Sequence, residues 1–247
     1  MATRLPRSGR ASIRALLDRQ RRALPAFFAA ILAGWGFAGA ETIEGITFAT
    51  VPGQLYVPLD EAGHALHWRL SLEKPGFQLN CRPLDARRLR QLTDGTLLVP
   101  VDELRRAGAL LVPVSGGPVE VIDRGHRFTA TAGPKRVEVS LAKQQLRAWQ
   151  GTRLVLQSRI SSGRRDSTPA GEFKAGPYKA RMHYSTRYHN APMPWSVQIN
   201  GHIFVHGFSS VPTYPASHGC IRLPLDEGNP ARFFHDWVLT GTPVTVR

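Results

Sequence analysis

Residues 137–160 alternate between apolar and polar side chains, and this period of two constrains the fold more than any other feature. Val137, Val139 and Leu141 are separated from one another by polar residues. Because successive side chains of an extended strand point to opposite faces, the pattern is typical of strands with one buried face. Turns near residues 143–145 and 150–151 divide the stretch into predicted strands at 137–141, 146–149 and 154–160. We therefore expect hairpins of a sandwich or barrel-like sheet.

The composition agrees with a turn-rich, mostly β protein. The chain has 23 glycines and 19 prolines in 247 residues, which is about 17% against an average near 12%. This excess argues against a helical bundle, and the 42% of apolar residues excludes global disorder. Further elements are expected as a strand pair in 119–131, a strand over Ile199–Val205, a helix over 226–240 and a closing strand at 244–247. One or two short helices are thus expected in the C-terminal half.

An internal repeat precedes the alternating stretch. Residues 53–70 and 95–112 share seven identities in 18 positions at an offset of 42. Each copy is predicted to form a short strand and then a helix that begins at a proline, Pro58 or Pro100. Acidic residues follow both prolines, where the helix dipole favours negative charge. Residues 41–132 are therefore predicted to form a small α+β module.

Gly133-Pro134 interrupts the pattern and is interpreted as a linker. We expect few contacts to cross such a boundary between domains. The sequence therefore predicts two domains, the repeat module over 41–132 and a mostly β domain over 137–247.

The first 40 residues have the pattern of a secretory signal. Residues 1–22 contain seven arginines and one acid, and the run 23–40 that follows is uncharged and apolar. Ala38 and Ala40 supply the small residues of an A-x-A cleavage site. An uncleaved membrane anchor is the alternative, because the run reaches the lower edge of a spanning length. Either fate predicts an exported protein of the periplasm or cell envelope.

The chain is strongly basic, with a formal net charge of +14, of which residues 1–22 contribute +6. The remaining +8 indicates attraction to an anionic partner or surface. Nucleic acid is not predicted as that partner, because no basic stripe with interleaved aromatic residues follows the leader.

The residues most able to act in catalysis lie in the stretch 203–223. His206 is followed by Gly207, and Cys220 comes 14 positions after His206. A thiol is a useful nucleophile only when a neighbouring base accepts its proton, and an imidazole can do so. We expect Gly219 to allow a tight turn in which its N–H and that of Cys220 point at a developing oxyanion.

Three other roles for these residues remain open. Cys220 could be a buried structural cysteine, or it could form a disulfide with Cys81, the other cysteine of the chain. His202, His206, His218 and Cys220 are ligand types that suit zinc, although no CxxC or HExxH spacing is present. His64 and His67 are a weaker metal candidate, since no third ligand is in view. We expect no metal or other cofactor.

The chain resembles the L,D-transpeptidases of the YkuD type over residues 137–247. Their signature is a His-Gly, a spacer of about a dozen residues and a Ser-His-Gly-Cys-x-Arg-Leu segment, which this chain matches at residues 206–207 and 217–223. A second family element, Thr-Pro-x-Gly-x-Phe, is present at residues 168–173. Residues 137–149 are similar to the opening hairpin, and Met193-Pro194-Trp195 is similar to the segment before the histidine strand.

The resemblance implies a β-sandwich and ping-pong acyl transfer on tetrapeptide stems of peptidoglycan. Cys220 would attack the L-centre carbonyl of diaminopimelate and expel D-Ala, and an amine would then take the acyl group. The family pattern makes His206 the general base, oriented by the carbonyl of Gly207. Two further roles are implied: His218 and Arg222 would shape the pocket and hold stem carboxylates, and Ser217 would brace the turn at Gly219. Carbapenems acylate the cysteine of this family.

The resemblance leaves three points open. Residues 176–192 depart from the family pattern, so the acceptor amine is not identified. A hydrolytic relative that uses water as the acceptor would have the same residues, as an L,D-carboxypeptidase, and a non-catalytic wall-binding protein is a further alternative. Residues 41–132 resemble the small N-terminal domain of copper amine oxidases, which implies a structural or wall-contacting module without copper.

Overall fold

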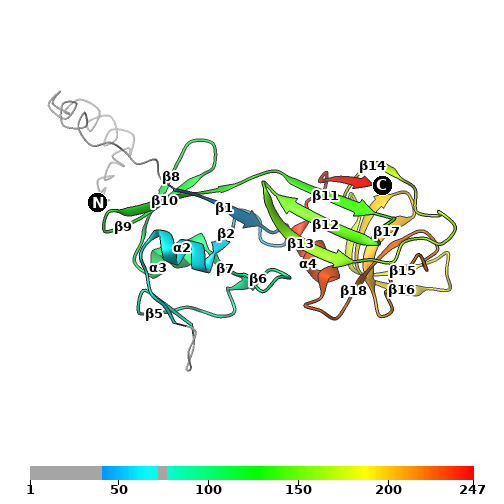
Figure 1. Cartoon of the computed structure of the whole chain (residues 1–247), viewed down its shortest axis with the longest axis horizontal. Coiled ribbons are helices and arrows are strands. Elements are labelled where there is room, and N and C mark those ends of the chain that lie inside the picture. Colours follow the sequence, from blue (N-terminus) through cyan, green and yellow to red (C-terminus); the bar gives the residue numbers. More distant parts are fainter. Residues whose placement is uncertain (1–40, 72–76) are drawn as a thin grey trace, which may run out of the picture. The chain divides into compact units, whose positions relative to one another are not determined.

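The computed structural model describes residues 41–71 and 77–247. The predicted signal peptide or anchor, residues 1–40, lies outside the described residues. Within the described ranges, no helix combines the length and the apolar character needed to cross a membrane. Strands dominate the described chain, so the expectation of a mostly β protein is confirmed (Figure 1).

The repeat module is built on a seven-stranded sheet with the order β6-β7-β2-β1-β10-β9-β8. Its strands are β1 (Glu41–Thr47), β2 (Leu55–Pro58), β6 (Arg90–Gln91), β7 (Leu97–Pro100), β8 (Leu110–Pro113), β9 (Val119–Asp123) and β10 (His126–Ala132). A separate three-stranded sheet consists of β3 (Leu70–Ser71), β4 (Gln78–Leu79) and β5 (Arg82–Pro83). The predicted strand pair in residues 119–131 is therefore confirmed as β9 and β10.

The two repeat copies have the predicted strand–helix form. β2 leads into helix α2 (Leu59–Ala65), and β7 leads into helix α3 (Val101–Arg106). Pro58 and Pro100 are the N-cap residues, and two acids lie in the first turn of each helix. β2 and β7 pair antiparallel with Val57 opposite Val99. The copies therefore share a central pair of strands.

Residues 135–247 form two further sheets. The first has the order β13-β12-β11-β19-β14 and consists of β11 (Lys135–Ser140), β12 (Gln145–Gln150), β13 (Arg153–Arg159), β14 (Gly171–Lys174) and β19 (Pro243–Val246). The second has the order β15-β16-β17-β18 and consists of β15 (Lys179–Ser185), β16 (Ala191–Asn200), β17 (Ile203–Phe208) and β18 (Ile221–Pro224). The three strands predicted from the alternating stretch are confirmed as β11, β12 and β13.

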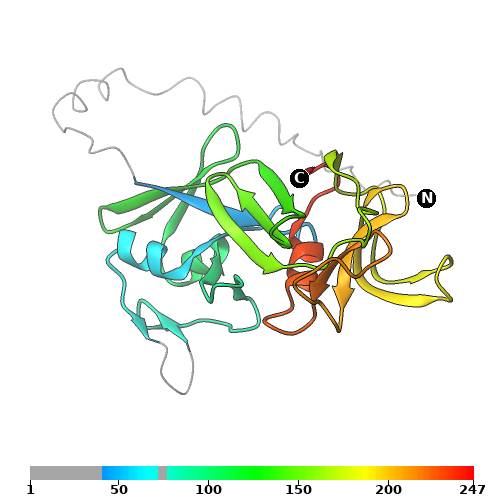
Figure 2. The same ribbon diagram turned by 45° about the vertical axis from the view of Figure 1, so that its right-hand side comes forward.

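The two sheets share one hydrophobic core with helix α4 (Pro230–Trp237), which lies against β16, β17 and β18 (Figure 2). The prediction of a helix over 226–240 is too long. Asn229 adopts a left-handed conformation, and its side chain accepts a hydrogen bond from the N–H of Arg232, so it caps the helix directly before Pro230. Val238 is extended and ends the helix.

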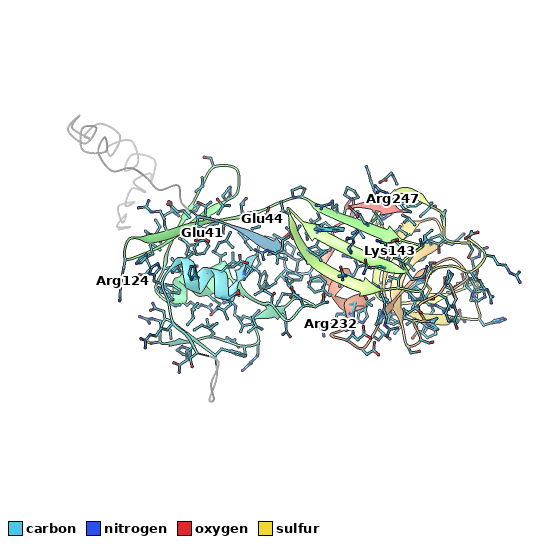
Figure 3. The ribbon with its side chains drawn as sticks, viewed as in Figure 1. Glu41, Glu44, Arg124, Lys143, Arg232 and Arg247 are labelled. Atoms are coloured by element: carbon cyan, nitrogen blue, oxygen red, sulfur yellow. The ribbon has the colours of Figure 1, made fainter. Side chains whose placement is uncertain are left out.

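The expectation that few contacts cross Gly133-Pro134 is wrong. Ile46 and Phe48 belong to the same core as Val137 and its neighbours. The buried Nζ of Lys135 donates to the carbonyls of Thr47 (2.8 Å) and Trp237 (2.5 Å). The carboxylate of Glu44, a residue labelled in Figure 3, accepts hydrogen bonds from the N–H and hydroxyl of Thr152. Residues 41–132 therefore pack onto the C-terminal domain instead of being tethered to it.

Candidate active site

His206 lies on β17, which begins after a turn at Gly201-His202. The prediction of one strand over Ile199–Val205 is therefore wrong, because β16 ends at Asn200 and β17 runs antiparallel to it. The His206 side chain is buried, and its Nδ1 lies 2.8 Å from the carbonyl oxygen of Gly207. A carbonyl only accepts, so Nδ1 carries the proton and the neutral ring keeps Nε2 as an acceptor.

Burial lowers the pKa of His206 to about 4, because the protonated ring would lose its hydration. The hydrogen bond to Gly207 opposes this shift, while the charges of Arg222 and His183 add to it. The imidazole is therefore neutral at physiological pH and able to accept a proton at Nε2.

Gly207 is required by the close approach of α4. A Cβ at this position would lie 2.4 Å from Cδ2 of Leu225 and 3.1 Å from Cβ of Ala231. A side chain here would force Leu225 to move and would press on Ala231 of the helix. The glycine therefore allows its own carbonyl to lie within hydrogen-bond distance of Nδ1 of His206.

Cys220 directly precedes β18, which pairs parallel with β17. Its Sγ donates to the carbonyl oxygen of His202 at 3.6 Å. Burial raises the pKa of the thiol, although a backbone hydrogen bond from Phe204 and the charge of Arg222 oppose this effect. The resting pair is therefore a neutral thiol and a neutral imidazole.

Ser217 closes the turn before the cysteine. Its hydroxyl donates to the carbonyl of Cys220 at 2.5 Å and accepts from the N–H of Gly219 at 3.0 Å. The expectation that the Gly219 N–H points at an oxyanion is wrong, since Ser217 occupies that donor. The N–H of Cys220 has no hydrogen-bond partner within the described ranges. Of the amides of Gly219 and Cys220, that of Cys220 is therefore the one without an internal acceptor in the described chain.

Thr168, which sequence reasoning assigned no role, fixes the turn from the opposite side. Its buried hydroxyl donates to the carbonyl of Gly219 and accepts from the N–H of Gly163, both at 2.7 Å. Gly219 has a φ of +141°, and a Cβ there would lie 2.9 Å from Cδ1 of Ile203. The Thr-Pro element of the family motif is thereby explained as a support for the cysteine turn.

His218 and Arg222 flank the cysteine and line the same cavity as Cys220 and His206, which has a volume of about 500 Å³. The exposed His218 accepts a hydrogen bond from Arg164 at its Nε2 (2.5 Å). Its pKa is lowered by desolvation and by the charges of Arg164 and Arg222. The guanidinium of Arg222 stacks on the ring of Phe208 at 3.9 Å.

The hairpin of β15 and β16 forms one wall of this cavity, which sequence reasoning had left without a role. His183 stacks on Phe204 at 5.1 Å, and Tyr188 in the hairpin turn stacks on His218 at 4.5 Å. His183 lies on β15, and both His183 and His189 line the cavity.

A change of face within β16 brings this wall into place. Trp195 packs towards α4, against the ring of His235. Met193, two residues earlier, lines the cavity, although residues two apart on a regular strand share a face. Trp195 itself has a φ of +57°, which is unusual for a bulky residue, and Ser196 braces the bend by donating to the carbonyl of Met193 (2.7 Å). The irregular Trp195 thus turns the outer half of the hairpin towards the cavity that His206 and Cys220 line.

The other roles considered for the cysteines and histidines find no support in the geometry. Cys81 and Cys220 are both free cysteines, so they do not form a disulfide with each other. Across the described chain, no three residues among His, Cys, Asp and Glu lie close enough together to hold a metal ion. His202 lies in the turn before β17 and not on one strand face with His206.

Residues 134–246 match the family model of the YkuD L,D-transpeptidase catalytic domain. This part of the chain therefore carries a catalytic domain of the YkuD type. The match includes none of residues 41–132, and the resemblance of that module to the N-terminal domain of copper amine oxidases stays a prediction. No curated protein matches the chain significantly.

Solved structures similar to the chain include L,D-transpeptidases from Stackebrandtia nassauensis (23% identity, TM-score 0.41) and Xylanimonas cellulosilytica (32% identity, TM-score 0.39). The similarity covers 46% and 47% of this chain, and it spans 55% and 62% of theirs. An L,D-transpeptidase in complex with imipenem is 16% identical, with 83% of this chain and 99% of that chain covered and a TM-score of 0.42.

Proposed function

We propose that the protein is an exported L,D-transpeptidase that acts on peptidoglycan stem peptides through a cysteine acyl-enzyme. The observation that carries this proposal is the tautomer of His206. Its Nδ1–H is committed to the carbonyl of Gly207, so Nε2 is a proton acceptor inside the cavity that Cys220 also lines. A base held in this way can activate a thiol without an acidic third residue.

In the first half-reaction, the thiol attacks the L-centre carbonyl of diaminopimelate in a tetrapeptide donor. The Sγ proton passes to Nε2 of His206 as the C–S bond forms. The imidazolium returns that proton to the departing amine, so D-Ala leaves and a thioester remains on Cys220. Because burial keeps both resting groups neutral, attack and proton transfer are coupled steps.

The tetrahedral intermediate places negative charge on the former carbonyl oxygen. The N–H of Cys220 is the backbone donor for this oxygen, while Ser217 and Thr168 keep the turn from moving. In the second half-reaction, an acceptor amine attacks the thioester and gives its proton to His206, which then restores the thiol. Water in place of the amine would make the protein a carboxypeptidase.

The test combines a small acylating probe with the polymer. Imipenem is the carbapenem bound in one of the similar structures, and incubation with it should add one acyl group to the protein in an intact-mass spectrum. The Cys220→Ala variant should remain unmodified. Purified sacculi, followed by product analysis, should yield cross-linked or amine-modified stems. Released D-Ala without a new amide bond would assign hydrolysis, and an unmodified wild-type protein would refute a catalytic role for Cys220.

The signal sequence supports export, and the basic charge that remains outside it supports attraction to an anionic wall. We further propose that the repeat module contributes to this contact. Binding of the catalytically inactive Cys220→Ala protein to sacculi, measured by sedimentation, should weaken as salt is raised.

A further inference from the structure

The cavity beside Cys220 is lined by arginine and histidine side chains. Arg187 and Arg222 line it together with five histidines, and none of the described residues that line it is an aspartate or a glutamate. Arg164 adds a further guanidinium next to His218. A concave site with this lining attracts an anionic ligand.

The guanidinium groups at the cavity are not neutralised by the protein. Within residues 41–71 and 77–247, neither Arg164, Arg187 nor Arg222 forms an ion pair with a carboxylate. Nε of Arg222 is buried without a hydrogen-bond partner, and burial lowers the pKa of this guanidinium. Arg159 of β13, by contrast, pairs with Glu227 at 2.9 Å. A buried N–H without an acceptor costs free energy, and a ligand oxygen that accepts from it would recover that cost.

The groups around the cavity also repel one another. The charge of Arg222 lowers the pKa values of both His206 and His218, and Arg164 acts on His218 in the same direction. A carboxylate bound among them would relieve this repulsion. The carboxamide of the same shape carries no charge and would not relieve it.

Arg187 is the member of this set that the hairpin contributes. It lies in the turn between β15 and β16, next to Tyr188, whose ring stacks on His218. Arg187 therefore lines the cavity from the hairpin, which lies at the other edge of this sheet from β18.

We propose that the cavity binds stem peptides with a free diaminopimelate side-chain carboxylate in preference to stems in which that group is amidated. Arg187 is the residue that makes this distinction, by pairing with the carboxylate. This inference rests on the proposed function for the identity of the ligand. It makes Arg187 a specificity-determining residue, since the attack by Cys220 does not require it.

Protection of the thiol measures this selectivity without requiring turnover. Two synthetic tetrapeptides are compared, identical except that the diaminopimelate side chain of one ends in a carboxylate and that of the other in a carboxamide. The rate at which iodoacetamide alkylates Cys220 is measured at increasing concentrations of each peptide. Cys81 is exposed and would react as well, so the Cys81→Ser background is used. The acid should protect at about tenfold lower concentration than the amide, which corresponds to one charged hydrogen bond.

The Arg187→Gln variant should reduce this discrimination to about twofold, chiefly by weakening protection by the acid. Arg124→Gln makes the same change of charge in the exposed turn between β9 and β10 and should keep the tenfold difference (Figure 3). Equal protection by the two peptides, or an unchanged ratio in Arg187→Gln, would overturn the inference.

Turnover of the same peptides, followed by release of D-Ala, reports on the proposed function separately. Turnover of both peptides with equal protection would leave the transpeptidase proposal standing and remove the selectivity. Selective protection by the acid without turnover of either peptide would leave the selectivity standing and remove the transpeptidase proposal. The two failures are therefore distinguishable.

Discussion

Replacement of Thr168 by valine tests how the cysteine turn is held. The side chains are nearly the same shape, but valine lacks the hydroxyl that bridges the N–H of Gly163 and the carbonyl of Gly219. Thr168 is only 3% exposed, so water cannot replace the lost partner without movement. Two buried backbone groups would be left unpaired, at about 1–3 kcal/mol each.

The expected loss of stability for Thr168→Val is therefore about 2–6 kcal/mol, which lowers the Tm by about 4 °C or more for a chain of this size. The catalytic effect should be separate from this loss. Because Gly219 directly precedes the nucleophile, acylation by imipenem at a temperature where the variant is folded should slow by about tenfold or more.

Matched variants separate the hydroxyl from the side-chain volume. Thr168→Ser keeps the hydroxyl and should retain most of the acylation rate. Thr213→Val makes the same chemical change at an exposed position and should alter neither quantity. A Thr168→Val protein with the wild-type Tm and acylation rate would refute the reasoning, and one with a lowered Tm but a normal rate would limit Thr168 to the fold.

Three further predictions concern single groups. Cys220→Ala should abolish acylation by imipenem and keep the wild-type circular dichroism spectrum, because it removes a reactive atom from a half-exposed position; an adduct on this variant would point to another nucleophile. His206 must be neutral to act as a base, and its pKa is about 4, so the acylation rate should fall below about pH 4 instead of near 6.5. Burial lowers the pKa of Lys135 to about 7, so above that pH the unfolded state binds more protons than the folded state. The free energy of unfolding of the wild type should therefore rise by about 2 kcal/mol from pH 7 to pH 9, relative to that of Lys135→Met, when both are measured by urea unfolding. If the free energy of unfolding varied with pH in the same way for both proteins, the lowered pKa of Lys135 would be contradicted.

The sequence predicted best the features that depend on local patterns. The alternation along 137–160 located three strands, because side-chain direction on a strand follows directly from the period of two. The two repeat copies were found for a similar reason, since a proline followed by acids favours a helix start wherever it occurs. These signals act over a few residues and need no knowledge of tertiary contacts.

The site could be predicted only as a set of residues. The motif located His206 and Cys220 on segments that the structure brings to one cavity, but it could not show which backbone donors are free. The hydroxyl of Ser217 accepts a hydrogen bond from the N–H of Gly219 because of the particular bend of this turn. The hairpin wall was missed for a related reason. Trp195 has a positive φ and packs against α4, and no glycine or asparagine marks this position in the sequence.

Gly133-Pro134 illustrates how one local signal can have two physical causes. Glycine permits unusual backbone angles at a linker, but it also permits two backbones to approach each other closely. A Cβ on Gly133 would lie 2.4 Å from Cα of Gly151, and the N–H of Gly151 donates to the carbonyl of Pro134 at 2.8 Å. The glycine is therefore required by contact with the β12–β13 turn. Lys135 connects β1 to the end of α4, and Ala231 of that helix lies against Gly207. The repeat module is therefore in continuous contact with the residue whose carbonyl orients His206.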